Sequence, residues 1–371
     1  MTKAWRRTLL SITLTLGACS SDDDPPGGEH LAVVRGTLAD PATARADHDG
    51  TAAAVEAHAT ELGDIGHTIG LGASIFDTGP HEFVAIDRWA EPDNMDEFYG
   101  DPNFRAGLEA QVDNASVQHY RRRADWYGWG DAAAASGGPR WFALVQAEFA
   151  DPPTAQEGHD RAARAAESVA AQLGDRAHLV FTGRDDERAF LALDIWESPS
   201  GIAAFYGDPG FQQSATELFT GPPVVTVFHS TNWHQWGVDE PVASLDGAWQ
   251  VTSFTCDGAA MPIGDFSLTV RAAAGVFVQA FDPGCVATLE EEYVYAQDGG
   301  FEIAPLDLTC DPSDTCDAVL GASCLPPPLP TRFDWELDGE RLTFRRTAEG
   351  PVDFPCEVGD QVEFTLERNS L

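Results

Sequence analysis

The chain has 371 residues, of which 43% are hydrophobic, and its formal net charge at pH 7 is −38. A surface with such an excess of acidic groups repels nucleic acids and anionic membranes, because both present dense negative charge. Nucleic-acid binding is therefore excluded, whereas the hydrophobic fraction is that of a chain with packed globular domains.

The N-terminus has the pattern of a secretory signal. A basic start precedes an apolar run at 9–16, which is too short to span a membrane as a helix. The ending LGAC resembles the lipobox of bacterial lipoproteins, which implies a signal peptide over 1–18 and a lipid on Cys19. An ordinary signal peptide beside a chance cysteine is the alternative. Ser20 after the cysteine implies anchoring in the cell envelope, at the outer membrane, and 19–29 predicts a flexible tether.

An internal repeat follows the tether. The stretch FYGDPNF at Phe98–Phe104 returns as FYGDPGF at Phe205–Phe211, and the flanking segments align around it. The two copies cover 30–131 and 139–240 and are joined by a linker of small residues at 132–138. Each copy is long enough to form one domain, so the repeat indicates a tandem duplication.

Each copy has the order strand, helix, two strands, helix, strand. The expected strands are Leu31–Leu38, His67–Phe76, Glu82–Trp89 and Ser116–Arg123, and then Trp141–Phe149, His178–Thr182, Ala189–Trp196 and Val224–Ser230. This order predicts a ferredoxin-like βαββαβ sheet with both helices on one face. The other face needs a cover, so we predict an α+β fold in which the two repeats pair as an intrachain pseudo-dimeric barrel. Such a chain is expected to be a monomer.

The repeated stretch reads as a break between two helical segments. Gly100 ends one segment, Asp101 caps the next and Pro102 suits its first turn, with both phenylalanines facing the core. We favour this interpretation over a catalytic role for Asp101 and its counterpart Asp208.

Element order, domain length and the W…FYGDPxF position resemble the dimeric α+β barrel superfamily, in particular antibiotic biosynthesis monooxygenase-like domains. The resemblance covers both copies. It implies cofactor-free or haem-linked oxidation of aromatic compounds, or decarboxylation and ring closure. A histidine that many such monooxygenases carry early in the second helix is absent, because Phe98-Tyr99 and Phe205-Tyr206 occupy its neighbourhood.

The last third, 244–371, differs in kind. Short strands separated by Asp-Gly turns predict an up-and-down barrel or a sandwich, and the opening LDGAWQVTS resembles lipocalin-like domains of bacterial lipoproteins. An even number of cysteines in an exported chain predicts three disulfides whose pairing stays open. These cysteines are Cys256, Cys285, Cys310, Cys316, Cys324 and Cys356.

The sheet faces offer candidate site residues. In FLALDIW the apolar set at 191, 193 and 195 is placed under the helices, so Asp194 and Trp196 are expected to face the barrel interior. The same rule places Asp87, Trp89 and, from the first strands, Arg35, Gln146 and Glu148 inside. We expect Arg35 to meet Asp87, and Gln146 or Glu148 to meet Asp194.

Two interpretations of this set remain open. The first is a pocket in which Trp89, Trp196, Arg35, Gln146 and Glu148 bind a planar ligand, and Asp87 or Asp194, its pKa raised by burial, accepts a proton. The second is a group of buried ion pairs that fixes how the sheets dock.

The histidines have no metal-ligand spacing. His48 and His159 lie in the buried stripes of the first helices, whereas His67 and His178 open strands expected at the far ends of those helices. Within one copy the two are therefore expected to lie apart, as satisfied core or cap residues, and no metal site is predicted.

The sequence thus predicts a lipid-anchored envelope protein that binds a small, partly aromatic or apolar ligand in the tandem barrel. One alternative is a monooxygenase-like enzyme with Asp87 or Asp194 as base, and another is a structural or interaction lipoprotein. No cofactor is predicted, because no motif supports haem or flavin.

Overall fold

The computed structural model of the chain describes residues 29–73, 75–76, 78–130, 141–237, 247–261, 265–271, 274–282, 285–295, 301–310, 331–338, 340–347, 356 and 358–368. Within 262–332 it describes strands but, Thr269 excepted, not their side chains. The predicted signal peptide, Cys19, the tether up to residue 28 and the linker at 132–138 lie outside the described residues.

The two copies have the same order of elements. The first contains β1 (His30–Leu38), α1 (Ala44–Glu61), β2 (Asp64–Gly72), β3 (Glu82–Trp89), α2 (Pro92–Gly100), α3 (Pro102–Gln111) and β4 (Val112–Arg122). The second contains β5 (Trp141–Glu148), α4 (Pro152–Gln172), β6 (Asp175–Gly183), β7 (Ala189–Trp196), α5 (Pro199–Tyr206), α6 (Pro209–Leu218) and β8 (Val224–Ser230). The expected second helix of each copy is therefore a pair of short helices.

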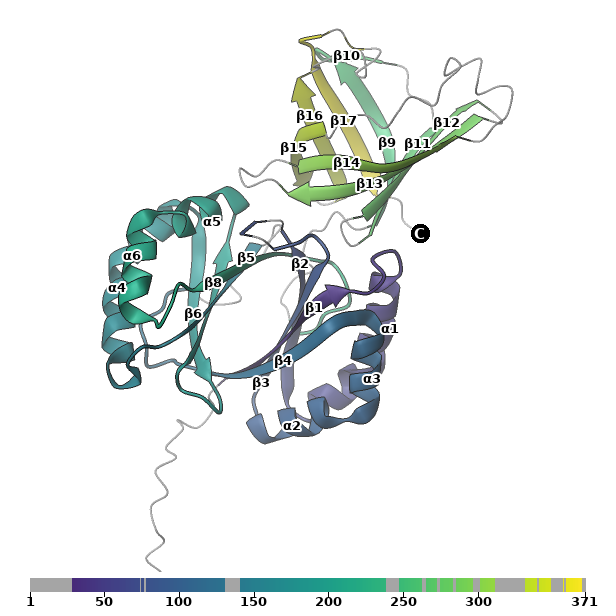
Figure 1. Cartoon of the computed structure of the whole chain (residues 1–371). Helices are drawn as coiled ribbons and strands as arrows, with labels where there is room; N and C mark the ends of the chain where they lie inside the picture. The colour runs from purple at the N-terminus through teal and green to yellow at the C-terminus, as the bar shows by residue number, and fades with distance from the viewer. Residues whose placement is uncertain are drawn as a thin grey trace, which may run out of the picture.

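The eight strands form one closed barrel in the order β1-β3-β2-β8-β5-β7-β6-β4. Strands of one copy meet strands of the other at two antiparallel seams, β2 with β8 and β4 with β6. Figure 1 shows the helices of the first copy on one side of the barrel and those of the second copy on the opposite side. Each copy therefore encloses a layer between its strands and its own helices.

The barrel interior is largely apolar, apart from a polar group around Arg35 and Gln146, and the expected facing of β3 and β7 is reversed. Leu191, Leu193 and Ile195 pack inside the barrel, whereas Asp194 and Trp196 lie beneath the helices. The register explains the reversal: Gln146 lies opposite Leu191, and Ala143 lies opposite Asp194. Directly opposite residues of paired strands share a face, and side chains alternate between the two faces along each strand. Ala143 and Gln146 are three residues apart, so Asp194 and Gln146 lie on different faces of the sheet.

The same correction applies to the first copy. Arg35 lies opposite Val84, and Ala32 lies opposite Asp87, so Asp87 and Trp89 also face the helices. The alternation of residues along β3 and β7 does not by itself decide which face points into the barrel, because both faces of these strands carry apolar residues. In the layer beneath the helices, the Asp87 and Asp194 carboxylates have tyrosine and histidine partners.

The helix break in the repeated stretch is confirmed. The Asp101 carboxylate accepts from the backbone N–H groups of Asn103 (2.6 Å) and Phe104 (3.2 Å) at the start of α3. In the second copy, Asp208 caps α6 in the same way, with distances of 2.7 and 3.2 Å to Gly210 and Phe211. The two prolines occupy the first turns of these helices.

Replacing either cap should therefore cost stability. We expect Asp208→Ala to lower the free energy of unfolding by about 1 kcal/mol, because two N–H groups of α6 lose their acceptor. Urea unfolding followed by circular dichroism measures the change, and Asp208→Asn, which keeps an acceptor oxygen, should stay close to the parent. A loss of ligand binding at unchanged stability would contradict the structural role.

The C-terminal part is an antiparallel meander. Its strands are β9 (Gly247–Cys256), β10 (Ala259–Ala260), β11 (Asp265–Arg271), β12 (Ala274–Asp282), β13 (Cys285–Tyr295), β14 (Phe301–Cys310), β15 (Thr331–Asp338), β16 (Arg341–Thr347) and β17 (Gln361–Arg368). The sheet closes on itself because β17 pairs with β9. Figure 1 shows this body beside the barrel.

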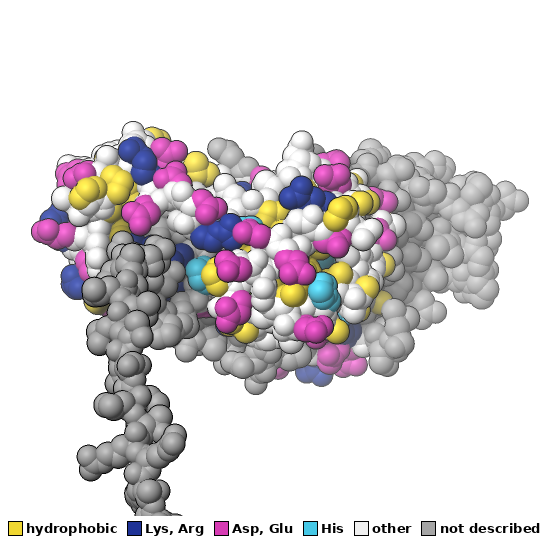
Figure 2. Space-filling view, turned by 90° about the horizontal axis from the view of Figure 1, so that it is seen from below, with side chains coloured by type: hydrophobic (Ala, Val, Ile, Leu, Met, Phe, Trp, Pro, Cys, Tyr) yellow, Lys and Arg dark blue, Asp and Glu magenta, His cyan; other side chains and the backbone are white. Residues whose placement is uncertain are grey.

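One disulfide, Cys256–Cys356, fixes this closure at the end of β9. Of the other predicted bridging residues, Cys285 and Cys310 lie on strands without described side chains, and Cys316 and Cys324 lie outside the described residues. Acidic side chains are spread over the barrel face seen in Figure 2 and do not gather in one patch. In the described part of the chain, no helix combines the length and the apolar character needed to cross a membrane.

Candidate functional site

Each copy carries a line of polar side chains in the layer between its strands and helices. We call Asp160, His159, His178, Asp194 and Tyr206 the second relay, and the equivalent Asp49, His48, His67, Asp87 and Tyr99 the first relay. The members come from the first helix, the second and third strands and the short helix after them. The two copies therefore share five polar positions on four elements.

In the second relay, each side chain contacts the next. The Tyr206 hydroxyl donates to Oδ2 of Asp194, and Oδ1 of the same carboxylate lies 2.5 Å from Nδ1 of His178. The Nε2 atoms of His178 and His159 are 3.1 Å apart, and His159 Nδ1 lies 3.3 Å from Asp160. The line thus runs from a buried tyrosine to a carboxylate near the surface.

The first relay repeats these contacts. The Asp87 carboxylate binds the Tyr99 hydroxyl and His67 Nδ1, and the Nε2 atoms of His67 and His48 are 3.1 Å apart. His48 Nδ1 lies 3.1 Å from Asp49. The expectation that the two histidines of one copy lie apart is wrong, because it considered backbone positions without the combined reach of two imidazole side chains.

Burial determines the charge states along the relays. Burial, and next the neighbouring His178, lowers the pKa of His159 to about 4, so this imidazole is neutral at pH 7. Burial and the Asp194 carboxylate raise the pKa of Tyr206 well above its usual value, so the hydroxyl keeps its proton. In the contact between the two Nε2 atoms one nitrogen donates and the other accepts, so the tautomers of the two imidazoles are coupled along the line.

A second carboxyl lies under each relay. Burial, and next the Asp194 carboxylate, raises the pKa of Asp175 to about 9, and burial and Asp87 raise that of Asp64 to about 8. Each accepts one backbone N–H, from Ala177 (3.1 Å) and from Gly66 (2.9 Å). Both carboxyls are therefore protonated in the folded protein at neutral pH.

This protonation gives the barrel a defined pH dependence. Above about pH 4 these carboxyls lose their protons in the unfolded state but keep them in the folded state, up to about pH 8 for Asp64 and about pH 9 for Asp175. The folded state therefore binds more protons in this range, and the contribution of the two carboxyls to stability falls as the pH rises. His159 acts in the opposite direction, but only between about pH 4 and its ordinary value of 6.5. Among the described groups with a shifted pKa, these two carboxyls are the ones whose pKa lies between about 8 and about 9.

We therefore expect the free energy of unfolding to decrease from pH 7 to pH 9, at up to about 1.4 kcal/mol per pH unit for each carboxyl. Urea unfolding at pH 7, 8 and 9 measures the slope. The double variant Asp64→Asn/Asp175→Asn mimics the protonated acids and should flatten it. An unchanged slope in that variant would assign the titration to other groups.

The tail of each copy covers the relay of the other copy. Trp129, which follows β4 of the first copy, stacks on His178 of the second with ring centroids 4.6 Å apart. Trp236, which follows β8 of the second copy, stacks on His67 of the first at 4.3 Å. Backbone bridges pair the same residues. We call 124–130 and 231–237 the exchanged tails; each relay is covered only when both copies are present.

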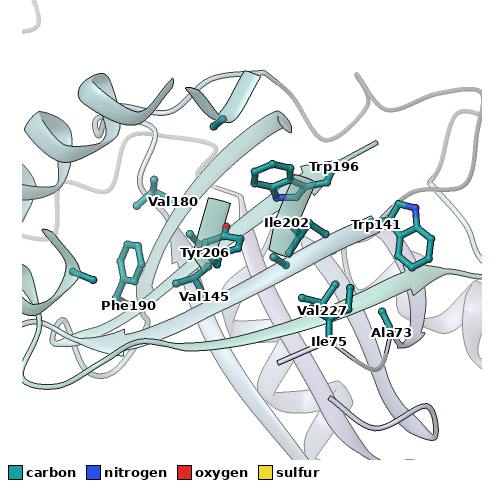
Figure 3. Packing of buried hydrophobic residues seen from close by; sticks show 14 of the residues in the cluster. Ala73, Ile75, Trp141, Val145, Val180, Phe190, Trp196, Ile202, Tyr206 and Val227 are labelled. Carbon is teal, nitrogen blue, oxygen red and sulfur yellow. The ribbon is translucent and has the colours of Figure 1, made fainter. Parts of the chain in front are cut away.

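A cavity opens beside the second relay. Its volume is about 450 Å³, and it lies between β5–β7 and helices α4, α5 and α6. Aromatic and alanine side chains form most of the wall, including Trp129, Phe190, Phe205 and Phe211. The polar lining residues are His159, Asp175, His178, Asp194, Tyr206, Asp208 and Ser214. Figure 3 shows Phe190, Val145 and Tyr206 in this layer. The equivalent space in the first copy is only about 60 Å³.

The predicted site residues do not form one pocket. Asp194 borders the cavity and Asp87 the small space of the first copy, whereas Trp89 and Trp196 are fully buried against the phenylalanine and tyrosine of the short helices. Arg35 does face the barrel interior, but its Nη1 donates to Gln146 (2.6 Å) and it pairs with Glu82 (3.5 Å). Glu148 is exposed at the end of β5. The expected contacts of Arg35 with Asp87, and of Gln146 or Glu148 with Asp194, are absent.

The sequence-based prediction also missed residues. The sequence pattern indicated Tyr99 and Tyr206 only as residues near the place of the absent family histidine, and it placed the two histidines of each copy apart. The sequence does contain a signal for these residues. The tyrosines and the histidine pairs occur at equivalent positions in both copies, and so do the two tryptophans of each exchanged tail. Because a buried tyrosine hydroxyl needs a partner, an aspartate on the neighbouring strand was the natural candidate.

No protein-family model and no curated protein sequence matches the chain, but solved structures resemble its barrel. An anthrone oxidase-like protein matches at 16% identity and a TM-score of 0.40, over 58% of this chain and 97% of its own. A monooxygenase-like protein from Listeria innocua matches at 11% identity and a TM-score of 0.34, over 56% of this chain and 96% of its own. A variant of DypB from Rhodococcus jostii, in complex with haem, matches at 14% identity and a TM-score of 0.36, over 56% of this chain and 94% of its own.

The lining of the cavity does not fit a haem. An axial ligand needs an imidazole nitrogen with a lone pair directed into the cavity. The Nε2 atoms of His159 and His178 instead face each other, with nearly parallel rings (10°), and their Nδ1 atoms contact Asp160 and Asp194. Among the described residues of this wall, neither histidine is available to iron.

Proposed function

We propose that the chain binds a small, partly aromatic or apolar molecule in the cavity of its second copy. The observation that carries the proposal is the wall itself: Phe190, Phe205, Phe211 and Trp129 surround about 450 Å³ beside a few convergent polar groups. A mostly apolar pocket of this size with few polar groups is typical of small-molecule sites. Aromatic rings offer flat contact surfaces to a planar ligand.

The fluorescence of N-phenyl-1-naphthylamine, which rises in apolar surroundings, tests this proposal. We expect saturable binding by the parent and about tenfold weaker binding by Phe211→Ala, which removes one aromatic wall. Phe104→Ala is the matched control, because Phe104 lies at the equivalent place in the first copy. A parent chain without saturable binding, or equal losses in both variants, would contradict the proposal.

An acid–base reaction in the same cavity is the second candidate, and the second relay favours it. Both oxygens of Asp194 are engaged by Tyr206 and His178, so this aspartate acts through His178 and is not itself the base. Every ring nitrogen of His178 and His159 faces the other histidine or an aspartate, so in this proposal one imidazole turns out of the Nε2–Nε2 contact to take up a proton from an acidic ligand group. Asp87, the other predicted base, borders a space of only about 60 Å³.

A comparison of His178→Gln with the parent separates a binder from an enzyme. Retained probe binding together with loss of solvent deuterium exchange at an acidic C–H of a bound 1,3-diketone supports the acid–base role. Absence of such exchange in the parent leaves binding as the function. A structural or interaction lipoprotein remains the interpretation for a chain that does neither.

We further propose that the two copies form a pseudo-dimer that arose by tandem duplication, that the C-terminal sheet is a lipocalin-like docking module, and that a lipid on Cys19 holds the chain in the envelope. The lipobox-like LGAC and the polar tether support the anchor. Incorporation of labelled palmitate by the parent and not by Cys19→Ala tests it. Labelling of both chains, or of neither, would contradict it.

A further inference from the structure

We propose that the duplicated barrel has a single ligand site, which Ala166 and Ala215 hold open in the second copy, while Val55 and Leu108 close the equivalent space in the first. This inference rests on the function proposed above and identifies the residues that determine which copy takes a ligand. It follows from comparing equivalent positions around the two relays.

The polar parts of the two sites are alike. Each is lined by two histidines and two buried aspartates of equivalent positions, and in each a tryptophan of an exchanged tail stacks on the strand histidine. Tyr206, Asp208 and Ser214 line only the second space, and Thr51 and Gln111 line only the first. Several wall residues also agree, since Phe83, Phe98 and Phe104 correspond to Phe190, Phe205 and Phe211. The difference between about 60 and about 450 Å³ must therefore come from the remaining wall positions.

Two of these positions differ in the direction required. Val55 on α1 corresponds to Ala166 on α4, and Leu108 on α3 corresponds to Ala215 on α6; all four residues line their respective spaces. The second copy thus lacks two carbon atoms at one position and three at the other. In the first copy both larger side chains pack against the buried cluster beneath the helices.

A hydrogen bond closes the first copy further. Gln111 Nε2 donates to Thr51 Oγ1 over 2.7 Å, which ties the end of α3 to α1 beside Val55. The equivalent residues, Leu218 and Ala162, cannot form this bond. The helices of the second copy therefore lack both the filling side chains and the polar link between them.

Two differences run the other way. Ser214 replaces Gly107, but its hydroxyl donates back to the Gly210 carbonyl of its own helix (3.0 Å). Phe219 replaces the smaller Val112, but its ring packs against Phe190 and Phe149, with centroids 5.0 and 5.4 Å away. It thus belongs to an aromatic cluster in the wall and does not fill the cavity. The first copy shows that valine and leucine fit at these two positions. The alanines of the second copy therefore leave it with weaker packing than the first copy has.

Photolabelling with benzophenone, a small neutral aromatic ketone, tests the inference because it reports where the probe sits. The full chain is irradiated with the probe, and the labelled peptides are mapped by mass spectrometry. In the parent we expect label on α4–α6 and none above background on α1–α3. Ala166→Val/Ala215→Leu should reduce the label on α4–α6 at least tenfold, and Val55→Ala/Leu108→Ala should add label on α1–α3.

The outcomes separate this inference from the proposed function. A parent without label on either set of helices overturns both. A parent labelled on α4–α6, with Ala166→Val/Ala215→Leu labelled equally, overturns the inference alone, as does equal labelling of both copies in the parent. Thermal unfolding checks that each double variant is folded. If Val55→Ala/Leu108→Ala unfolds, the single variant Val55→Ala takes its place.

Discussion

Replacing Asp194 by Asn is expected to lower the free energy of unfolding of the barrel by about 2–4 kcal/mol. The buried Asp194 carboxylate binds both the Tyr206 hydroxyl and His178 Nδ1. An asparagine offers one acceptor oxygen and an N–H₂ group, so one partner faces a donor instead of an acceptor. Because the site excludes most water, the unmatched donor loses its solvation without compensation.

Urea unfolding followed by tryptophan fluorescence measures this loss. Asp87→Asn should cost a similar amount, since Tyr99 and His67 contact Asp87 in the same way. Tyr206→Phe, which removes one hydrogen bond and leaves the carboxylate bound to His178, should cost less, about 1–2 kcal/mol. A change below 0.5 kcal/mol in both asparagine variants would mean that the relays contribute nothing to the fold.

Removing the disulfide is expected to destabilise the C-terminal sheet by about 4–5 kcal/mol and to leave the barrel unchanged. Cys256 and Cys356 are 100 residues apart in the sequence, and a chain-entropy model gives about this magnitude for a loop of that length. The bridge also joins the strand that closes the sheet to the segment before β17. Without it, the unfolded C-terminal segment gains far more conformations than the folded one.

Calorimetry of the parent and of Cys256→Ser/Cys356→Ser tests this expectation. The transition of the C-terminal sheet should move to lower temperature, while the barrel transition and probe binding stay as in the parent. Reduction of the parent with dithiothreitol provides a second approach without substitution. A shift of the barrel transition by the same amount would show that the two parts unfold as one unit.

Element order was the part of the fold that could be predicted from sequence. Strand and helix periodicity, the duplicated phrase and the cap at Asp101 were sufficient, because each depends on residues close together in the chain. The facing of β3 and β7 could not be predicted, since apolar side chains occupy both faces of FLALDIW. It depends on the pairing register with β5, which places Asp194 opposite Ala143.

The candidate site could be predicted only where the signal was local in the sequence. Asp87 and Asp194 were identified from polar residues in apolar strands, which is a local signal. Their partners His178 and Tyr206 come from other elements, and Trp129 comes from the other copy. Contacts of that kind depend on how a helix crosses a sheet and on how two copies close a barrel, which no single segment encodes.

The exchanged tails constrain how this gene can change. Tyr127, on the tail of the first copy, donates to Glu167 of the second (2.5 Å), whereas His234, on the other tail, contacts Glu56 of the first (2.9 Å). Each tail is thus fitted to the body of the other copy, so the two halves of the gene can diverge in sequence but neither can be deleted alone. During synthesis, the first relay stays uncovered until the ribosome has released the tail at 231–237. The copy that is made first is the last to be completed.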